Sequence, residues 1–370
     1  MVKITPFDVE QWMDEYENTP GVLNVAETCC SSISIDKLVQ FDERRQDDNG
    51  GGRQYSTTIP LDLSARLTYG PIRGSDELRS HIADLYQDGA QGSPKRITKE
   101  HVLITQGAIS ANHLVFYTLV GPGDHVICVF PTYQQLYAVP ESLGAEVSLW
   151  ELKEEGGWIP DVATLEALIK DNTKMIVINN PNNPTGATIP SDVLASIIDV
   201  ARNHNIILFS DEVYRPLFHD TAATTTPSAL AGIRVGWVAS PSRDFIEQLA
   251  AARDYTTISV SQLDDQVARY ALHPSVRPGL LSRNLALACH GSSPWRARRR
   301  FGGGGEAVDD VQFCRDVLAR TKVMLVPGSK CFGHGKAFKG YVRMGYVCET
   351  AVLEEALTKL DGYIKEHLAV

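Results

Sequence analysis

The sequence predicts an α/β protein with a mostly parallel sheet flanked by helices, followed by a smaller α+β unit. Five short apolar runs of strand length lie between residues 101 and 212, and helical segments alternate with them. Such alternation is typical of a parallel sheet with helices on both faces. After residue 250 the pattern changes to a long helical segment, two short strand-like runs and a final helix.

The elements follow from local signals taken in chain order. Residues 74–87 form a helical pattern for which Ser75 is a suitable N-cap. Strands are expected at 101–105, 125–130, 145–152, 175–180 and 206–212, and helices between them at 110–120, 161–170 and 191–204. The C-terminal part is expected to contain a helix at 261–272, strand-like runs at 322–328 and 340–347, and a helix at 348–368. We therefore expect an N-terminal segment (1–45) that packs on a small domain (266–370), with a large domain (46–265) between them.

Composition excludes several classes of protein. The chain has 370 residues, a formal net charge of −10 and 43% apolar residues, which is ordinary globular composition and argues against nucleic-acid binding. No run of about 18 apolar residues predicts a membrane span, and the acidic N-terminus has no secretory pattern. Seven cysteines without a C-x-x-C pair suggest reduced thiols, a cytoplasmic location and no metal site.

Two polar motifs follow neighbouring predicted strands. NNPNNPTG, residues 179–186, is expected to make a rigid turn that presents amides at the carboxyl edge of the sheet. FSDEVYRPL, which ends the next strand, offers Asp211 and Tyr214 at the same edge. A single carboxylate there would be read as a helix cap or a surface residue. Two such strand ends in succession favour a ligand site.

Eight motifs in order carry a resemblance to a known family. They are YGPIRG, TQGAISA, FPTYQQLY, NPNNPTG, SDEVY, GIRVGW, VPGSKCFG and YVRMGY, from residue 69 to residue 346. Together they resemble the class I/II aminotransferases, the pyridoxal-phosphate enzymes of fold type I. The resemblance implies pyridoxal 5'-phosphate as cofactor, amino transfer between an amino acid and a 2-oxo acid, and a homodimer.

The resemblance also implies roles for residues around the pyridine ring. Asp211 matches the carboxylate that pairs with the pyridine nitrogen and keeps it protonated. Asn183 and Tyr214 match the donors to the phenolic oxygen of the ring. Tyr133 matches the aromatic residue that stacks on the ring face.

A second set of matches concerns the phosphate and the substrate. Gly107 and Ala108 lie at a strand-to-helix turn, where backbone N–H groups meet the phosphate, and Arg234 matches its arginine partner. Tyr69 matches a tyrosine that reaches the phosphate of the neighbouring subunit. Arg343 matches the arginine that holds the α-carboxylate of the substrate.

One position departs from the family pattern S-x-S-K-x5-G-x-R-x-G. With Gly232, Arg234 and Gly236 as anchors, the lysine that bonds to the cofactor should be residue 226, but this residue is Thr226. No lysine occurs between Lys174 and Lys322. We therefore expect this chain to be a poor or inactive transaminase.

Two segments are shorter than the resemblance implies. Between SDEVY and GIRVGW, the residues are too few for the interior strand that relatives carry there, so one strand of the sheet is expected to be missing. Residues 289–305 are rich in arginine and glycine where relatives carry a helix and a strand. A splice variant or gene-model error accounts for both losses, and evolutionary loss of catalysis is the competing explanation. A β-lyase or decarboxylase on the same scaffold, or a cofactor- or partner-binding relic, remain alternative functions.

Overall fold

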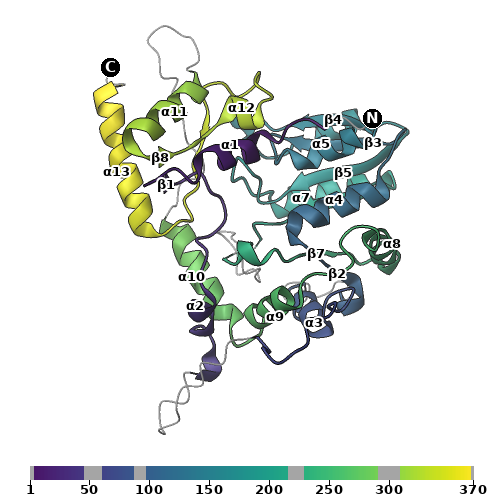
Figure 1. Ribbon diagram of the computed structural model, residues 1–370. Helices are drawn as coiled ribbons and strands as arrows, with labels where there is room; N and C mark the ends of the chain where they lie inside the picture. Colours follow the sequence, from purple (N-terminus) through teal and green to yellow (C-terminus); the bar gives the residue numbers. More distant parts are fainter. Residues whose placement is uncertain (1–3, 46–60, 87–96, 216–228, 291–308, 368–370) are drawn as a thin grey trace, which may run out of the picture. The chain divides into compact units, whose positions relative to one another are not determined.

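The computed structural model describes residues 4–45, 61–86, 97–215, 229–290 and 309–367. These residues divide into two units, which are described one at a time. Unit 1 contains residues 1–30, 120–212 and 287–370, and unit 2 contains residues 31–119 and 213–286. Both units are therefore built from segments that are far apart in the sequence (Figure 1).

Unit 1 is built on a four-stranded parallel sheet with strand order β4-β3-β5-β6. Its strands are β3 (His125–Phe130), β4 (Glu146–Glu151), β5 (Thr173–Asn179) and β6 (Ile207–Asp211). Every residue of β3 is buried, as its unbroken apolar run predicts for a central strand. The crossover helices are α5 (Gln135–Ser142), α6 (Val162–Leu168) and α7 (Ser191–Asn203), with a 3₁₀ turn at Glu154–Gly156.

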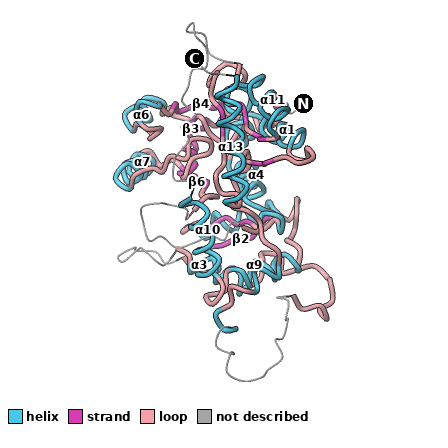
Figure 2. Tube along the Cα trace, turned by 90° about the vertical axis from the view of Figure 1, so that its left-hand side faces the viewer, coloured by secondary structure: helices cyan, strands magenta, loops and turns pink. Residues whose placement is uncertain are grey.

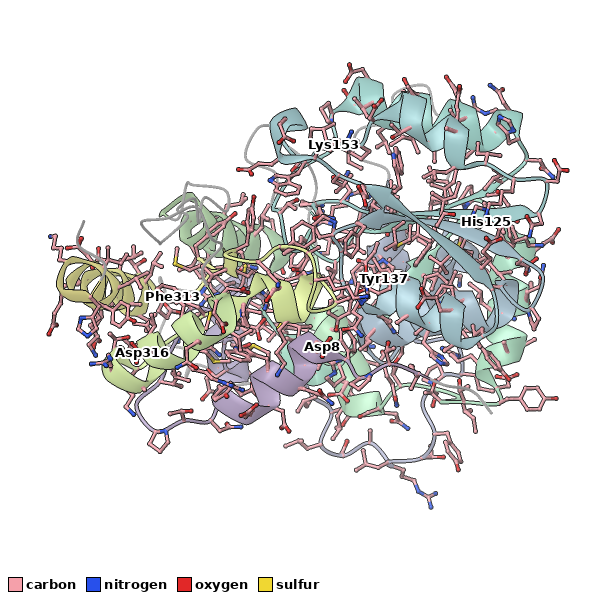
Figure 3. The ribbon with its side chains drawn as sticks, turned by 90° about the horizontal axis from the view of Figure 1, so that it is seen from above. Asp8, His125, Tyr137, Lys153, Phe313 and Asp316 are labelled. Carbon is pink, nitrogen blue, oxygen red and sulfur yellow. The ribbon has the colours of Figure 1, made fainter. Side chains whose placement is uncertain are left out.

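Helices cover both faces of this sheet. α6 packs on β4 and on α7, and α7 packs on β6 (Figure 2). α5 packs on β3 and β4, with Tyr137 on the other side of the sheet (Figure 3). The core beneath α6 and α7 includes Trp150, Leu165, Ile176 and Ile197, all almost fully buried. The expected parallel sheet with helices on both faces is confirmed.

The C-terminal part of unit 1 packs on the N-terminal segment. Trp12 of α1 (Asp8–Tyr16) is fully buried in one cluster with Val317, Val323 and Leu353. Its indole Nε1 donates to the carbonyl of Leu325 at 2.9 Å. The other elements here are β1 (Leu23–Asn24), α11 (Asp310–Thr321), β8 (Val323–Met324), β9 (Val326–Pro327), α12 (Gly328–Phe332), β10 (Val342–Arg343) and α13 (Thr350–His367). β1 pairs with β8 in parallel, and β10 pairs with β9 antiparallel.

Unit 2 holds a two-stranded antiparallel sheet of β2 (Val102–Thr105) and β7 (Gly236–Ala239). The other elements are α2 (Ile35–Val39), α3 (Asp76–Asp84), α4 (Gly107–Leu119), α8 (Arg243–Arg253), α9 (Gln262–Ala271), α10 (Arg277–His290, which continues into unit 1) and 3₁₀ turns at Glu43–Arg45, Lys99–His101 and Ala231–Ile233. The predicted N-cap is confirmed, because Ser75 Oγ accepts a hydrogen bond from the N–H of Leu78. α3 packs on α9 over a core of Leu78, Ile82 and Ile104 (Figure 1).

In the chain, the strand that we expect to be missing would come between β6 and β7, so the pairing partners of these two strands matter. Among the described strands, β6 pairs with β5 and β7 pairs with β2, and none joins the two sheets. The shortened segments fall largely outside the described residues, which omit 216–228 and 291–308. No described helix has the length and apolarity that a membrane crossing requires.

Candidate active site

The carboxyl ends of β5 and β6 bring the two polar motifs together. Asn179 and Asp211 are register partners at the end of the parallel pair. The Asn179 amide donates to the main-chain oxygen of Asp211 at 3.1 Å, and the N–H of Asn180 donates to the same oxygen at 2.9 Å. Asp211 is buried, with 6% of its surface exposed. The structure thus places Asp211 at the sheet edge where open α/β proteins bind ligands, as the motifs predict.

Most of the asparagine side chains in the NNPNNPTG loop hold the loop itself. Asn179 Oδ1 accepts from the N–H of Asn183 at 2.6 Å, and Asn180 Oδ1 accepts from a backbone N–H nine residues later. Asn182 Oδ1 accepts from the N–H and the hydroxyl of Thr185. These side-chain bonds add to the backbone hydrogen bonds between Asn182 and residues 186 and 187, and together they fix the turn. Asn183 differs, because its side chain meets a residue of the C-terminal segment.

That residue is Arg343 on β10, which is only 4% exposed. Its Nη1 donates to Asn183 Oδ1 at 3.3 Å, and its Nη2 donates to the carbonyl of Ala26 at 2.8 Å. Its Nε is buried and has no hydrogen-bond partner among the described residues. The guanidinium lies over the ring of Phe332, at 5.3 Å from its centroid.

Arg343 forms no ion pair with any carboxylate in the described part of the chain, although a buried unpaired guanidinium is costly. Burial raises the pKa of the nearby Cys29 and Cys331 thiols to about 12, so neither supplies a negative charge near neutral pH. The arrangement therefore suits a ligand that brings its own anionic group to Arg343. A carboxylate matches the guanidinium in charge and in planar geometry.

Tyr133 lies beside the N-terminal segment of unit 1. Its ring is 4.8 Å from that of Phe7, and its hydroxyl donates to Glu10 Oε1 at 2.7 Å. The next side chain, Gln134, donates to the carbonyl of Pro6 at 2.6 Å and accepts from the N–H of Asp8 at 3.0 Å. Figure 3 labels Asp8 at the start of α1 and Tyr137 on α5, the helix that follows Tyr133. Sequence reasoning missed this attachment, because a glutamine and a short acidic helix carry no pattern that links them.

In unit 2, a glycine turn brings the start of α4 against Arg234. β2 ends at Thr105, and α4 begins at Gly107, which has φ +77°. A Cβ at Gly107 would lie 2.9 Å from Arg234 Nη2, so the guanidinium closely approaches this residue, and the positive φ also favours glycine. A Cβ at Gly236 would lie 2.4 Å from the nitrogen of Ala108, so β7 passes directly against the first turn of the helix.

These features fit the phosphate of the cofactor. The first N–H groups of a helix lack partners inside the helix and carry partial positive charge, which favours an anion. Arg234 adds a full positive charge beside them, and it forms no ion pair within the described ranges. Its Nη1 donates to the carbonyl of Ala231 at 3.2 Å. Gly107, Ala108 and Arg234 are thus brought together within unit 2.

The remaining predicted residues are placed as follows. Tyr69 lies on a loop of unit 2, with 82% of its surface exposed. Tyr214 is the third residue after the end of β6 and is half-buried. Thr226 lies outside the described residues. No cluster of metal-ligating side chains occurs among the residues that were described.

Comparison with known proteins identifies the family. Residues 58–275, more than half of the chain, match the family model described as aminotransferase class I and II. The chain is 29% identical to capreomycidine synthase of Streptomyces vinaceus over 331 residues, covering 80% of this chain and 81% of that protein. It is 28% identical to an arginine–pyruvate transaminase of Pseudomonas aeruginosa, with 80% and 82% covered.

Solved structures agree with these relatives. A pyridoxal-phosphate-dependent aminotransferase from Streptococcus suis superposes with a TM-score of 0.81 at 32% identity, and 98% of each chain is covered. The resemblance inferred from the eight motifs is therefore confirmed. The chain belongs to the aminotransferase class I and II family, whose cofactor is pyridoxal phosphate and whose reaction is amino transfer between an amino acid and a 2-oxo acid.

Proposed function

We propose that this chain binds pyridoxal phosphate and an amino acid substrate through the predicted residues, but transfers amino groups slowly because it lacks the lysine. The observation that carries the proposal is the buried guanidinium of Arg343, which has Asn183 beside it and no carboxylate partner in the described chain. A carboxylate ligand would supply the missing charge and accept from Nε. Every amino acid and 2-oxo acid substrate has such a group.

The roles of the other residues follow from their positions. Bound pyridoxal phosphate supplies an electron sink that stabilises negative charge at the substrate Cα. Asp211, at the end of β6, is the residue that would hold the proton on the pyridine nitrogen. Asn183 uses its oxygen to accept from Arg343, which assigns its Nδ2 to donate to the phenolic oxygen. Tyr214 is the second donor to that oxygen, and Tyr133 is the aromatic residue for the ring face.

The phosphate is assigned to unit 2. Gly107 and Ala108 would offer N–H groups at the start of α4, and Arg234 would pair with the phosphate oxygens. We assign Tyr69 to the phosphate of a neighbouring subunit, in a homodimer that acts in the cytoplasm. Its 82% exposure supports this assignment, because an exposed tyrosine is available to a partner chain. We also propose that the chain divides into an N-terminal segment (1–45), a large cofactor-binding domain (46–265) and a small C-terminal domain (266–370).

Residue 226 is the position at which this chain lacks the lysine of the family pattern. A lysine amine bonds to the cofactor and moves a proton at the substrate Cα, whereas the hydroxyl of Thr226 does neither at a useful rate. Cofactor binding is then non-covalent, since the phosphate, pyridine and carboxylate contacts do not depend on the lysine.

Borohydride reduction tests this proposal. The chain is titrated with pyridoxal phosphate while its absorbance is followed, reduced with borohydride, unfolded and desalted. We expect saturable binding and no cofactor retained on the unfolded chain. A chain with the missing segment restored from a relative is the positive control, and it should retain the label. Absence of saturable binding, or a label on a lysine of the unmodified chain, would contradict the proposal.

A further inference from the structure

The loop that carries Tyr69 is held by one face of helix α9. Three side chains of this helix, at positions 262, 265 and 266, bond to backbone groups between residues 62 and 75. Positions i, i+3 and i+4 share a face of an α-helix. The helix therefore acts on the whole length of the loop, although the loop has no regular secondary structure between Leu61 and Ser75.

Gln262 makes the contact closest to Tyr69. Its Nε2 donates to the carbonyl of Thr68 at 2.6 Å, and the carbonyls of Tyr69 and Arg66 lie 3.4 and 3.5 Å from the same nitrogen. Gln266 acts in the opposite sense, because its Oε1 accepts from the N–H of Asp62 at 2.6 Å. One glutamine of the pair is thus a donor and the other is an acceptor.

Gly70 brings the loop backbone directly against this helix start. A Cβ at Gly70 would lie 3.1 Å from the carbonyl oxygen of Val260 and 3.4 Å from Cγ of Gln262. Val260 is 5% exposed and packs in one core cluster with Leu78 and Ile104. The contact therefore joins the loop to the packed core of unit 2.

The same loop exposes large apolar side chains. Leu63, Leu67 and Tyr69 have 75%, 71% and 82% of their surface exposed. A fixed backbone that displays exposed side chains is preorganised for binding, because less conformational entropy is lost when a partner arrives. An unfixed loop would lose that entropy at the moment of binding.

We propose that Gln262 is the positioning residue for Tyr69, and that its amide determines how well Tyr69 serves the cofactor phosphate of a second copy of this chain. This inference rests on the role given to Tyr69 in the proposed function. Gln262 acts through the loop and touches neither cofactor nor substrate. Its loss should weaken cofactor binding, and should do so only while the Tyr69 hydroxyl is present.

The donor and acceptor glutamines supply a matched pair of variants. Gln262→Glu replaces a donor with a carboxylate that faces carbonyl oxygens, so the hydrogen bond from residue 262 to the carbonyl of Thr68 is lost. Gln266→Glu makes the same chemical and charge change one turn later, but it keeps an acceptor for Asp62. A negative charge at residue 262, the first residue of α9, also suits the helix dipole, so the substitution should not unwind the helix.

The experiment measures the dissociation constant of pyridoxal phosphate by absorbance titration for Gln262→Glu, Gln266→Glu, Tyr69→Phe and the double variant Gln262→Glu/Tyr69→Phe. We expect roughly three- to tenfold weaker binding for Gln262→Glu and for Tyr69→Phe, with less than about a twofold change for Gln266→Glu. The double variant should bind about as weakly as Tyr69→Phe alone. If Gln262→Glu unfolds the chain, Gln262→Met removes the donor without adding charge and takes its place.

Two results would overturn the inference in distinguishable ways. If Tyr69→Phe weakens binding while Gln262→Glu has the same dissociation constant as Gln266→Glu, the hydrogen bond from Gln262 to the loop has no role in cofactor binding, and the proposed function stands. If Tyr69→Phe has no effect, the assignment of Tyr69 to the phosphate fails, and the inference fails with it.

Discussion

Arg343 donates a hydrogen bond from Nη1 to Oδ1 of Asn183 at 3.3 Å, and its buried Nε has no partner among the described residues. This pair links the C-terminal segment to the loop after β5 inside unit 1. The unpartnered Nε–H and the positive charge of this buried guanidinium suit a ligand that brings a carboxylate.

Arg343→Gln should weaken binding of 2-oxo acids to the chain loaded with pyridoxamine phosphate by roughly ten- to a hundredfold, because one charge-assisted contact is worth about 1.5–3 kcal/mol. Arg343→Lys keeps the charge but loses the planar guanidinium, so its affinity for 2-oxo acids should lie between those of the parent chain and Arg343→Gln. Calorimetric titration with a panel of 2-oxo acids measures the effect. The control is Arg202→Gln, which removes the same charge from an exposed position. Equal affinities for Arg343→Gln and the control would remove Arg343 from the site.

Asp211→Ala and Arg234→Ala should each weaken pyridoxal phosphate binding by roughly ten- to a hundredfold, again through loss of a charge-assisted hydrogen bond. Asp211 is buried at the end of β6, whereas Arg234 lies beside Gly107. Absorbance titration gives both dissociation constants. If both variants bind as tightly as the parent chain, the pyridine and phosphate assignments are wrong.

Gly107→Ala should reduce the free energy of cofactor binding by more than it reduces the free energy of unfolding. The backbone at Gly107 has φ +77°, which costs an alanine roughly 1–2 kcal/mol. The added Cβ would lie 2.9 Å from Arg234 Nη2, so the guanidinium must move away from the helix start. Gly121→Ala is the control, because nothing lies within 4 Å of its Cβ position. Titration should separate the two variants, and matching affinities would show that Arg234 does not depend on this turn.

The folding stability of the chain should decrease in mild acid because His125 is buried. It is fully buried on β3, with Nδ1 2.8 Å from Thr173 Oγ1 and Nε2 2.9 Å from Ser148 Oγ. Burial, with a smaller contribution from Lys170, lowers the pKa of His125 below its ordinary 6.5. The unfolded chain therefore takes up a proton at a higher pH than the folded chain does, so folding stability decreases as the pH falls through 6.5. The slope contributed by one such group is at most about 1.4 kcal/mol per pH unit.

Urea unfolding between pH 5 and pH 7.5, a range set by the ordinary histidine pKa of about 6.5, measures this slope. His125→Asn should reduce it by up to one proton, whereas His113→Asn, at an exposed position of α4, should leave it unchanged. Part of the slope should remain in His125→Asn, because burial also lowers the pKa of His273. An identical slope in both variants would show that His125 is not the group that titrates.

The proposed homodimer has a direct physical test. Tyr69, Leu67 and Leu63 are exposed on one loop, and a partner chain would cover them. Sedimentation velocity at micromolar concentration should show a dimer, and Leu67→Glu should shift it toward monomer. A monomer that still binds cofactor would contradict a site shared between subunits.

The parts of the fold that follow a local rule were predictable from the sequence. The apolar run of β3 gives a buried central strand, and Ser75 caps α3 as its position predicts. Parallel strands end at one edge, which is why Asn179 and Asp211 could be expected to meet. The contacts of Arg343 with Asn183 and of Gln262 with Thr68 join residues far apart in sequence, and no periodicity predicts which distant side chains meet. Likewise, the apolar run in 322–328 contains β8, which pairs with β1, and β9, which pairs with β10, before α12 begins at Gly328; no local pattern predicts that parts of one run pair with different strands.

Amino transfer by the unmodified chain tests the central claim most directly. Pyridoxamine phosphate formation from bound pyridoxal phosphate is followed with a panel of amino acids, for the unmodified chain, for Thr226→Lys and for a chain with the missing segment restored from a relative. General acid–base help alone is worth about 10²–10⁴-fold, and both roles of the lysine are absent. We expect negligible turnover from the unmodified chain, little gain from Thr226→Lys and a large gain from the restored segment. Turnover by the unmodified chain equal to that of the restored chain would show that another residue performs the work of the lysine.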